Sequence, residues 1–262
     1  MDKYNVYQDM GKRTGGEIYL GVVGPVRTGK STFIKRFMEL VVLPEMKDDN
    51  EKERTIDELP QSADGKTIMT TEPKFVPKDA VTIHFSGQEI AKIRLVDCVG
   101  FLVPEATGFA EGEKMRMVKT PWSEEEMPFS RAAAMGTEKV IREHSNIGVI
   151  VTTDGSFGDI AAENFEEALQ QTVNECNKVG KPYIILLNTV NPASEETMLR
   201  KQQMEQKFGK TVVPVNCRNM NREEAFSIME QLLADFPITR INFLVPKWVE
   251  FLTMDNWLKQ DL

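Results

Sequence analysis

The sequence predicts an α/β fold with a doubly wound, mostly parallel sheet and one antiparallel edge strand. Three observations support this prediction. Short apolar runs alternate with amphipathic segments along most of the 262 residues. The first apolar run leads into a glycine-rich turn that is followed by a helical pattern. In the first half of the chain, two apolar runs are separated by little more than Ser86–Gly87, which is typical of paired antiparallel strands.

The composition narrows the class of protein. Apolar residues make up 41% and charged residues 27% of the chain, which is close to the globular average and allows a sizeable core. A net charge of −8 argues against a general binder of nucleic-acid backbones, which needs an excess of lysine and arginine. We expect one large domain, residues 1–237, followed by an extension, residues 238–262.

Cysteine usage and hydropathy favour the cytoplasm. The three cysteines, Cys98, Cys176 and Cys217, show no metal-ligand spacing, so we do not expect a zinc site. Few and unpatterned cysteines are typical of a protein in a reducing compartment. No apolar run approaches the ~18 residues of a membrane-spanning helix. Met1–Gly11 lacks the basic and apolar regions of a secretion signal.

The first predicted strand and helix flank the glycine-rich turn. Ile18–Gly24 is a short apolar run that ends in glycine, as expected of a buried strand. Lys30–Val42 carries apolar side chains at helical spacing, and Pro44 stops it. Leu43–Pro77 is polar and shows no clear period, so we expect a long irregular connection of the kind that is usually functional.

The rest of the chain is expected to form a hairpin and then alternating elements. Val81–Phe85 and Ile90–Asp97 are the paired strands. Gly100–Phe129 holds several prolines and glycines and is predicted to be irregular. The elements expected after it are the helix Ala132–His144, the strand Ile147–Thr153, the helix Asn164–Lys178 closed by Gly180, the strand Tyr183–Asn188, the helix Ser194–Phe208, the strand Val212–Val215 and the helix Arg222–Asp235.

The turn after the first strand matches the phosphate-binding pattern GxxxxGK[ST] at every fixed position. Glycines let successive backbone N–H groups point at phosphates, and the following helix directs its partial positive charge at the same anion. In this pattern Lys30 reaches the β- and γ-phosphates, and the Ser31 hydroxyl ligates Mg²⁺. The predicted nucleotide-binding residues of this P-loop are Gly24, Pro25, Val26, Arg27, Thr28, Gly29, Lys30, Ser31 and Thr32.

A second motif, D-x-x-G, begins at the end of the strand Ile90–Asp97. In P-loop proteins a strand-terminal aspartate orients a magnesium water, and the glycine after it lets an N–H face the γ-phosphate. We expect Asp97 and Gly100 in these roles. Lys30 and Asp97 are therefore predicted catalytic residues, and Ser31 and Asp97 are predicted to hold the metal.

Thr70 and Thr71 lie in the polar connection between the first helix and the second strand. A threonine in this region can complete the Mg²⁺ shell when triphosphate is bound and leave it after hydrolysis. Both are candidate catalytic residues, with Thr71 as the candidate metal ligand. The residues alone do not choose firmly between the pair.

Two positions bear on how water would be activated. Phe101 stands where many GTPases carry a water-orienting glutamine, and a phenyl ring cannot orient water. Hydrolysis must then use Thr70 or Thr71, another loop residue, or a group from a neighbouring subunit. Arg27 either neutralises transition-state charge from within the same chain or is a solvated loop arginine.

The base-reading motif of ordinary GTPases is only partly present. N-K-x-D reads guanine because its carboxylate accepts from the base N1–H and N2–H₂. The corresponding run is Asn188-Thr189-Val190-Asn191, in which Asn188 alone matches, and we expect Asn188 to contact the nucleotide. An Asn191 amide cannot accept two hydrogen bonds as a carboxylate does, which argues against guanine and favours ATP. Asn191 could equally be a turn residue before Pro192 that contacts no base.

Several stretches together resemble the stage IV sporulation protein A family, the spore-coat morphogenetic ATPases of endospore-forming bacteria. They are Gly15–Gly24, Leu59–Ser62, Thr67–Pro77, Arg94–Gly100 and Thr152–Gly155, of which Thr67–Pro77 is far more specific than the P-loop. The resemblance covers essentially the whole chain. It implies a fold like that of translation-factor-related GTPases and hydrolysis of ATP with Mg²⁺. Its Walker A lysine falls on Lys30, its Walker B aspartate on Asp97, and its sensor threonines on Thr70 and Thr71.

The same resemblance implies that hydrolysis drives irreversible self-assembly into a static layer at the base of the spore coat. It implies recruitment to the forespore surface, in the mother-cell cytoplasm, by a small amphipathic membrane protein, and docking of other coat proteins. Family members are much longer, so residues 238–262 are expected to lead into a region absent from this chain. The resemblance does not extend autonomous polymerisation or recruitment to this chain by itself.

The C-terminal extension carries apolar side chains on one broad helical face after Pro246. They are Trp248, Phe251, Leu252, Met254, Trp257 and Leu258. This face is either a contact for a neighbouring subunit or the packed side of a helix on its own domain, and the second interpretation is favoured.

Three functions stay open on the residues alone. They are an ATPase that drives self-assembly, a GTP-regulated switch, and a nucleotide-stabilised scaffold with negligible turnover. The run Asn188–Asn191 favours the first over the second, and Phe101 keeps the third open. The family resemblance favours the first.

Overall fold

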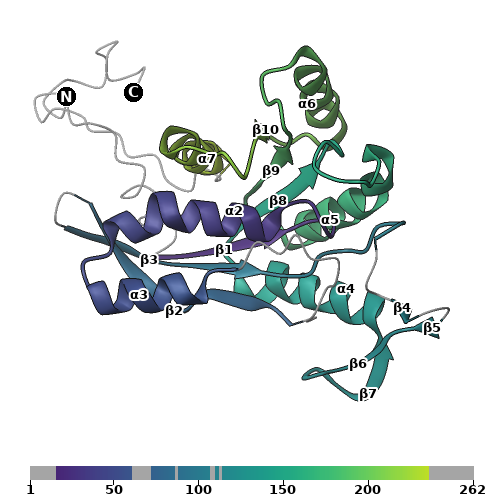
Figure 1. Ribbon diagram of the computed structural model, residues 1–262, viewed down its shortest axis with the longest axis horizontal. Helices are drawn as coiled ribbons and strands as arrows, with labels where there is room; N and C mark the ends of the chain where they lie inside the picture. Colours follow the sequence, from purple (N-terminus) through teal and green to yellow (C-terminus); the bar gives the residue numbers. More distant parts are fainter. Residues whose placement is uncertain (1–15, 61–71, 86–87, 107–109, 112–113, 236–262) are drawn as a thin grey trace, which may run out of the picture.

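The computed structural model describes residues 16–60, 72–85, 88–106, 110–111 and 114–235. Its centre is a six-stranded sheet with the strand order β10-β9-β8-β1-β3-β2. The strands are β1 (Glu17–Val23), β2 (Lys74–Phe85), β3 (Gln88–Asp97), β8 (Ile147–Thr153), β9 (Tyr183–Asn188) and β10 (Val212–Val215). Neighbouring strands run parallel except at one edge, where β2 is antiparallel to β3. The predicted mostly parallel sheet with one antiparallel edge strand is confirmed (Figure 1).

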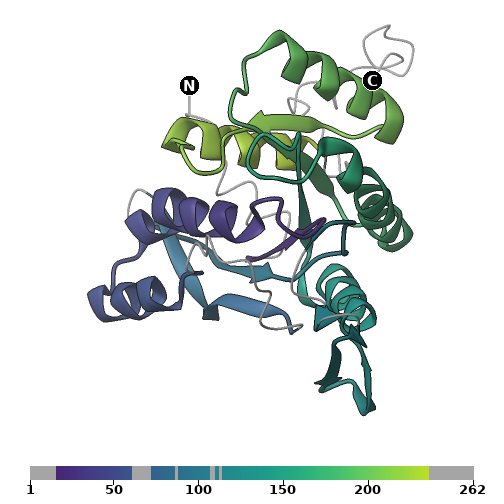
Figure 2. The ribbon, with the colours of Figure 1, turned by 45° about the vertical axis from the view of Figure 1, so that its right-hand side comes forward.

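Helices cover both faces of the sheet (Figures 1 and 2). On one face lie α2 (Lys30–Phe37), which a π turn (Met38–Val42) extends, and α7 (Arg222–Ala234). On the other face lie α4 (Phe129–Lys139), α5 (Glu166–Val179) and α6 (Glu195–Phe208). Because both faces are covered, β1, β8 and β9 are almost entirely buried, and this is why they read as continuous apolar runs.

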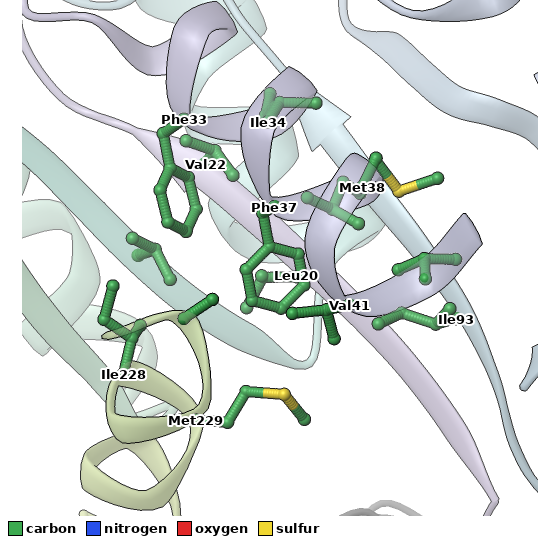
Figure 3. Close-up of a cluster of buried hydrophobic side chains, with 14 of the residues drawn as sticks. Leu20, Val22, Phe33, Ile34, Phe37, Met38, Val41, Ile93, Ile228 and Met229 are labelled. Carbon is green, nitrogen blue, oxygen red and sulfur yellow. The ribbon is translucent and has the colours of Figure 1, made fainter. Parts of the chain in front are cut away.

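The core between α2 and the sheet fixes the start of α2 against the end of β1. Phe33, Ile34 and Phe37 of α2 are fully buried, and they pack with Leu20 and Val22 of β1. Ile228 and Met229 of α7 close the cluster from the other side (Figure 3). This packing holds the loop between β1 and α2 at the carboxyl edge of the parallel strands, which is where ligands bind in open α/β sheets.

The connection after α2 is more ordered than predicted. A helix, α3 (Asp49–Glu58), forms there, and the Asp48 carboxylate caps it by accepting from the N–H groups of Asn50 and Glu51. Only Thr55 of this helix is buried, so the segment has no apolar period that would reveal it. Strand β2 also begins at Lys74, seven residues before the predicted start, with a register shift between Val76 and Val81.

The stretch predicted to be irregular between Gly100 and Phe129 contains two small hairpins. Strand β4 (Ala110–Glu111) pairs with β5 (Lys114–Met115), and β6 (Met117–Thr120) pairs with β7 (Ser123–Pro128). The β6–β7 hairpin leads directly into α4 and lies beside it, apart from the main sheet (Figure 1). The helix predicted from Ala132 begins at Phe129, directly after β7.

Candidate functional site

The P-loop connects the central strand β1 to α2 at the carboxyl edge of the sheet. The Thr28 hydroxyl donates to the carbonyl of Pro25 at 3.0 Å and closes the loop on itself. Gly24 has φ +130°, and a Cβ there would lie 2.3 Å from the carbonyl oxygen of Val151, so only glycine fits. Gly29 begins α2 without a side-chain cap, and the first turn of the helix carries no acidic residue. The N-terminal N–H groups of α2 therefore have no side-chain cap and can bind an anion held by the loop.

Lys30 lies under the loop with its ammonium facing backbone oxygens. Its Nζ donates to the carbonyls of Pro25 at 2.6 Å and Gly24 at 3.3 Å, and the residue is 5% exposed. Burial lowers the pKa of the Lys30 ammonium, and the nearby Cys98 and Asp97 oppose that shift. An ammonium group has three N–H donors, so these two carbonyls leave one for a phosphate oxygen.

Asp97 and Ser31 meet beside the lysine. Asp97 is the last residue of β3 and pairs in register with Val22 of β1, which brings its carboxylate next to the P-loop. The Ser31 hydroxyl donates to Asp97 Oδ2 at 2.6 Å. Burial raises the pKa of Asp97, and the Ser31 hydrogen bond and the Lys30 charge counteract this.

The residues at this point fit a magnesium ion. Asp97 Oδ1 is buried and has no hydrogen-bond partner, which is costly for a carboxylate oxygen. Carboxylate and hydroxyl oxygens are the protein ligands that Mg²⁺ prefers, and it binds through one or two of them together with phosphates and waters. The predicted third ligand, Thr71, lies outside the described residues, as does Thr70.

Gly100 brings the segment after β3 into contact with the P-loop. It has φ +95°, and a Cβ there would lie 1.9 Å from the carbonyl oxygen of Gly24 and 2.8 Å from Lys30 Nζ. The next residue, Phe101, accepts from the N–H of Val26 at 2.9 Å. Its ring is 2% exposed and packs in an apolar cluster that also contains Val26 and Phe165. Phe101 therefore anchors the D-x-x-G segment on the P-loop.

This close contact makes a Gly100→Ala variant testable. We expect it to lower the free energy of unfolding by about 3 kcal/mol, because the backbone must combine positive-φ strain with a shift of the Gly24 carbonyl or Lys30. Urea denaturation measures this. The matched control is Gly209→Ala, where φ is +63° and a Cβ meets nothing within 4 Å, so about 1 kcal/mol of strain is expected. Equal losses in the two variants would contradict the close contact.

Asn188 has a role that the sequence did not suggest. Its side chain is buried, donating from Nδ2 to the carbonyl of Thr28 at 3.0 Å and accepting at Oδ1 from the N–H of Cys217 at 3.0 Å. The amide thus holds the end of β9 and the residues after β10 against the P-loop. Its predicted contact with the nucleotide stays a prediction.

Asp154 and Thr189 also lie at this edge and were not among the predicted site residues. The buried Thr189 hydroxyl donates to Asp154 Oδ2 at 2.5 Å. Thr189 stands at the lysine position of the run that corresponds to N-K-x-D. A serine, threonine or aspartate after a buried strand is too common to signal such a pairing, since it depends on two strand ends meeting in space.

Arg27, the P-loop residue with φ +62°, is exposed, which suits either of its two interpretations. Within the parts of the chain that the structure describes, no group of three or more His, Cys, Asp or Glu residues is arranged to hold a metal. Among the helices of these same parts, none combines the length and apolar character needed to cross a bilayer.

Comparison with known proteins gives a consistent result. The family model described as the ATPase domain of stage IV sporulation protein A matches residues 1–237. The chain is 48% identical over 260 residues to stage IV sporulation protein A of Bacillus subtilis (strain 168), which covers 99% of this chain and 53% of that protein. It is 48% identical over 258 residues to the protein of that name from Clostridioides difficile (strain 630), covering 98% and 52%. The corresponding protein of Bacillus anthracis is 46% identical over 260 residues. The chain thus spans about half the length of these relatives.

Proposed function

Because the chain belongs to the stage IV sporulation protein A family and comprises its ATPase domain, we propose that it binds ATP with Mg²⁺ in the P-loop and hydrolyses the β–γ phosphoanhydride. We propose further that this hydrolysis drives self-assembly of the full-length protein into the basement layer of the spore coat. The observation that best supports the catalytic part is the junction of Lys30, Ser31 and Asp97. It joins an ammonium, a hydroxyl and a buried carboxylate oxygen that has no partner.

In this proposal each residue contributes a distinct interaction. Backbone N–H groups of the P-loop and the start of α2 hold the phosphates, and the Lys30 ammonium neutralises charge on the β- and γ-phosphates. Mg²⁺, when bound, would supply positive charge against the negative charge that develops as the bond breaks. Ser31 and Asp97 would hold it on the side of β3. Gly100 presents backbone to the γ-phosphate, where a side chain would collide with Lys30.

Phe101 does not orient the attacking water, because its ring is buried among apolar side chains. This role therefore belongs to another residue. Thr70 and Thr71 are proposed as the sensors of the γ-phosphate, on the strength of the family resemblance. Arg27 is proposed to neutralise transition-state charge from within the same chain, since it is exposed on the P-loop.

The assembly partners are proposed from the same family membership. They are further copies of the protein, a small amphipathic protein at the membrane surface and other spore-coat proteins, in the mother-cell cytoplasm at the forespore. We also propose that the fold is related to that of translation-factor-related GTPases. The P-loop, the D-x-x-G segment and the mixed sheet support this relationship.

Phosphate release with ATP and GTP side by side tests the proposed function. We expect ATP to be hydrolysed and to compete at least about 10-fold better than GTP, because the end of β9 carries Asn191 where guanine selectivity requires a carboxylate. Sedimentation before and after turnover shows whether hydrolysis and assembly are linked in the full-length protein. Equal affinities, or stronger binding of GTP, would favour the GTP-regulated switch. Binding of ATP without phosphate release would favour the scaffold.

A further inference from the structure

Lys74 is a cation beside the site that belongs to neither the P-loop nor the D-x-x-G segment. It is the first residue of β2 and pairs in register with Asp97 of β3, which in turn pairs with Val22 of β1. Side chains in register on neighbouring strands lie on the same face of a sheet. Val22 belongs to the core beneath α2, and Ser31 in the first turn of α2 donates to Asp97. The side chain of Lys74 therefore also lies on the α2 face.

The charge of Lys74 acts on the carboxylate of Asp97. Directly opposite residues of antiparallel strands have Cβ atoms about 5 Å apart. Burial raises the pKa of Asp97, and the positive charge of Lys74 is among the effects that lower it. Lys74 is nevertheless exposed, and it does not occupy Asp97 Oδ1, which has no hydrogen-bond partner. The ammonium is thus close enough to influence the carboxylate and is still available to a ligand.

The strand order places Lys74 across Asp97 from the P-loop. Strand β1 leads into the P-loop, β3 ends at Asp97 and β2 begins at Lys74, in this order across the sheet (Figure 1). A triphosphate held by the P-loop would place its γ-phosphate towards Asp97 and Gly100, on the side of β3. The flexible carbon stem of lysine allows its ammonium to extend from β2 to that phosphate.

The other charged groups of the site leave negative charge to be offset. Lys30 donates two of its three N–H groups to the carbonyls of Gly24 and Pro25. Asp97 adds its own negative charge to that of the triphosphate, and the buried Phe101 ring supplies no polar group. A cation held next to the reacting phosphate stabilises the charge that develops in the transition state. An ammonium on the β2 side of the site would supply that charge.

We propose that Lys74 is a catalytic residue, whose ammonium binds the γ-phosphate and stabilises the negative charge on its oxygens during hydrolysis. Lys74 neither transfers a proton nor forms a covalent bond in this role. Because ADP has no γ-phosphate, the contact also favours binding of ATP over binding of the product. This inference rests on the proposed function, because it assigns a further residue to the same nucleotide site.

The test compares Lys74→Gln, which removes the charge, with Lys74→Arg, which keeps it. Displacement of a fluorescent ADP analogue from the whole chain by AMP-PNP and by ADP, with Mg²⁺ present, measures the two affinities. In Lys74→Gln we expect the affinity for AMP-PNP to fall by about 10-fold and that for ADP to stay within about twofold. Phosphate release from ATP should fall by about 100-fold. Lys74→Arg should keep most of the affinity and of the turnover.

The matched control is Lys78→Gln. It removes an exposed lysine charge from the same strand, further from the residue that pairs with Asp97. The N–H of Lys78 donates to Glu58 and its carbonyl accepts from Arg94, and both contacts are made by backbone atoms that the substitution keeps. Both affinities and the rate of phosphate release should therefore match those of the wild type.

The outcomes separate this inference from the function on which it rests. A wild-type chain that does not bind AMP-PNP, or that releases no phosphate from ATP, overturns the proposed function and the role of Lys74 with it. An active wild type, with an unchanged ratio of AMP-PNP to ADP affinity in Lys74→Gln, overturns only the role of Lys74. Equal losses for both nucleotides in Lys74→Gln, or the same change of ratio in Lys78→Gln, also overturn that role. The effect would then come from folding or from overall charge.

Discussion

Replacing Lys30 with alanine is expected to weaken ATP binding by about 1,000-fold. The ammonium is the cation that the structure places beneath the P-loop, 2.6 Å from the carbonyl of Pro25 and beside Gly24. The free N–H of the ammonium and the N–H of the long 3.3 Å contact to Gly24, once released from that carbonyl, can both donate to phosphate oxygens. Two such charge-assisted hydrogen bonds, worth about 2 kcal/mol each, would be lost together, and about 4 kcal/mol corresponds to this factor. Titration with a fluorescent ATP analogue measures the change in Kd, and phosphate release should fall below detection.

The control for Lys30→Ala is Lys35→Ala, which removes the same charge from the last turn of α2. It should leave the Kd for ATP within about twofold of the wild type, because a partly exposed charge away from the ligand is largely screened by solvent. Thermal melting of both variants shows whether they remain folded. Affinity for ATP that is unchanged in Lys30→Ala would remove the P-loop as the binding site.

Replacing Asp97 with asparagine is expected to lower magnesium-dependent turnover by about 1,000-fold, with a smaller loss in nucleotide affinity. Asparagine keeps the shape of the side chain and an oxygen that can accept from Ser31, so the fold should survive the change. What disappears is the charge on a buried carboxylate whose Oδ1 has no other partner. The variant isolates the carboxylate's charge from its packing.

Magnesium titration makes the Asp97 test specific. In the wild type, chelation of Mg²⁺ should reduce phosphate release to the level of Asp97→Asn, and added Mg²⁺ should restore it. In the variant, Mg²⁺ should change the rate little. The control is Asp159→Ala, which removes an exposed carboxylate from the loop after β8. Steady-state hydrolysis that is unaffected in Asp97→Asn would rule out the metal-holding role.

The sequence predicted the parallel part of the fold well, for a physical reason. The strands Ile147–Thr153, Tyr183–Asn188 and Val212–Val215 have the predicted bounds. The first two are buried almost throughout, and strands buried on both faces must be apolar along their whole length. Helix α3 could not be predicted from periodicity, since it buries little more than Thr55 and depends on its Asp48 cap. The start of β2 was missed because Pro77, Lys78 and Asp79 interrupt its apolar pattern.

The residues of the site also fall into two groups, those that local sequence patterns predict and those that they do not. The P-loop and the D-x-x-G segment are local patterns, and the structure brings Gly24, Lys30, Ser31, Asp97 and Gly100 together as the patterns indicated. The positions of Asn188 and Asp154 depend on contacts between residues more than 30 positions apart, such as Thr28 with Asn188 and Asp154 with Thr189. No local motif records such pairs, and their spacing varies with every loop between them.

The burial of Phe101 restricts how the molecule can respond once the terminal phosphate has gone. Moving the D-x-x-G segment outward would break the hydrogen bond from Val26 and expose the ring, at a cost of about 2 kcal/mol for the apolar surface alone. A nucleotide-dependent switch that resets in every cycle needs a segment that changes its position at little cost in free energy. The buried Phe101 ring makes such a movement costly, so we expect the D-x-x-G segment to hold the same position before and after turnover.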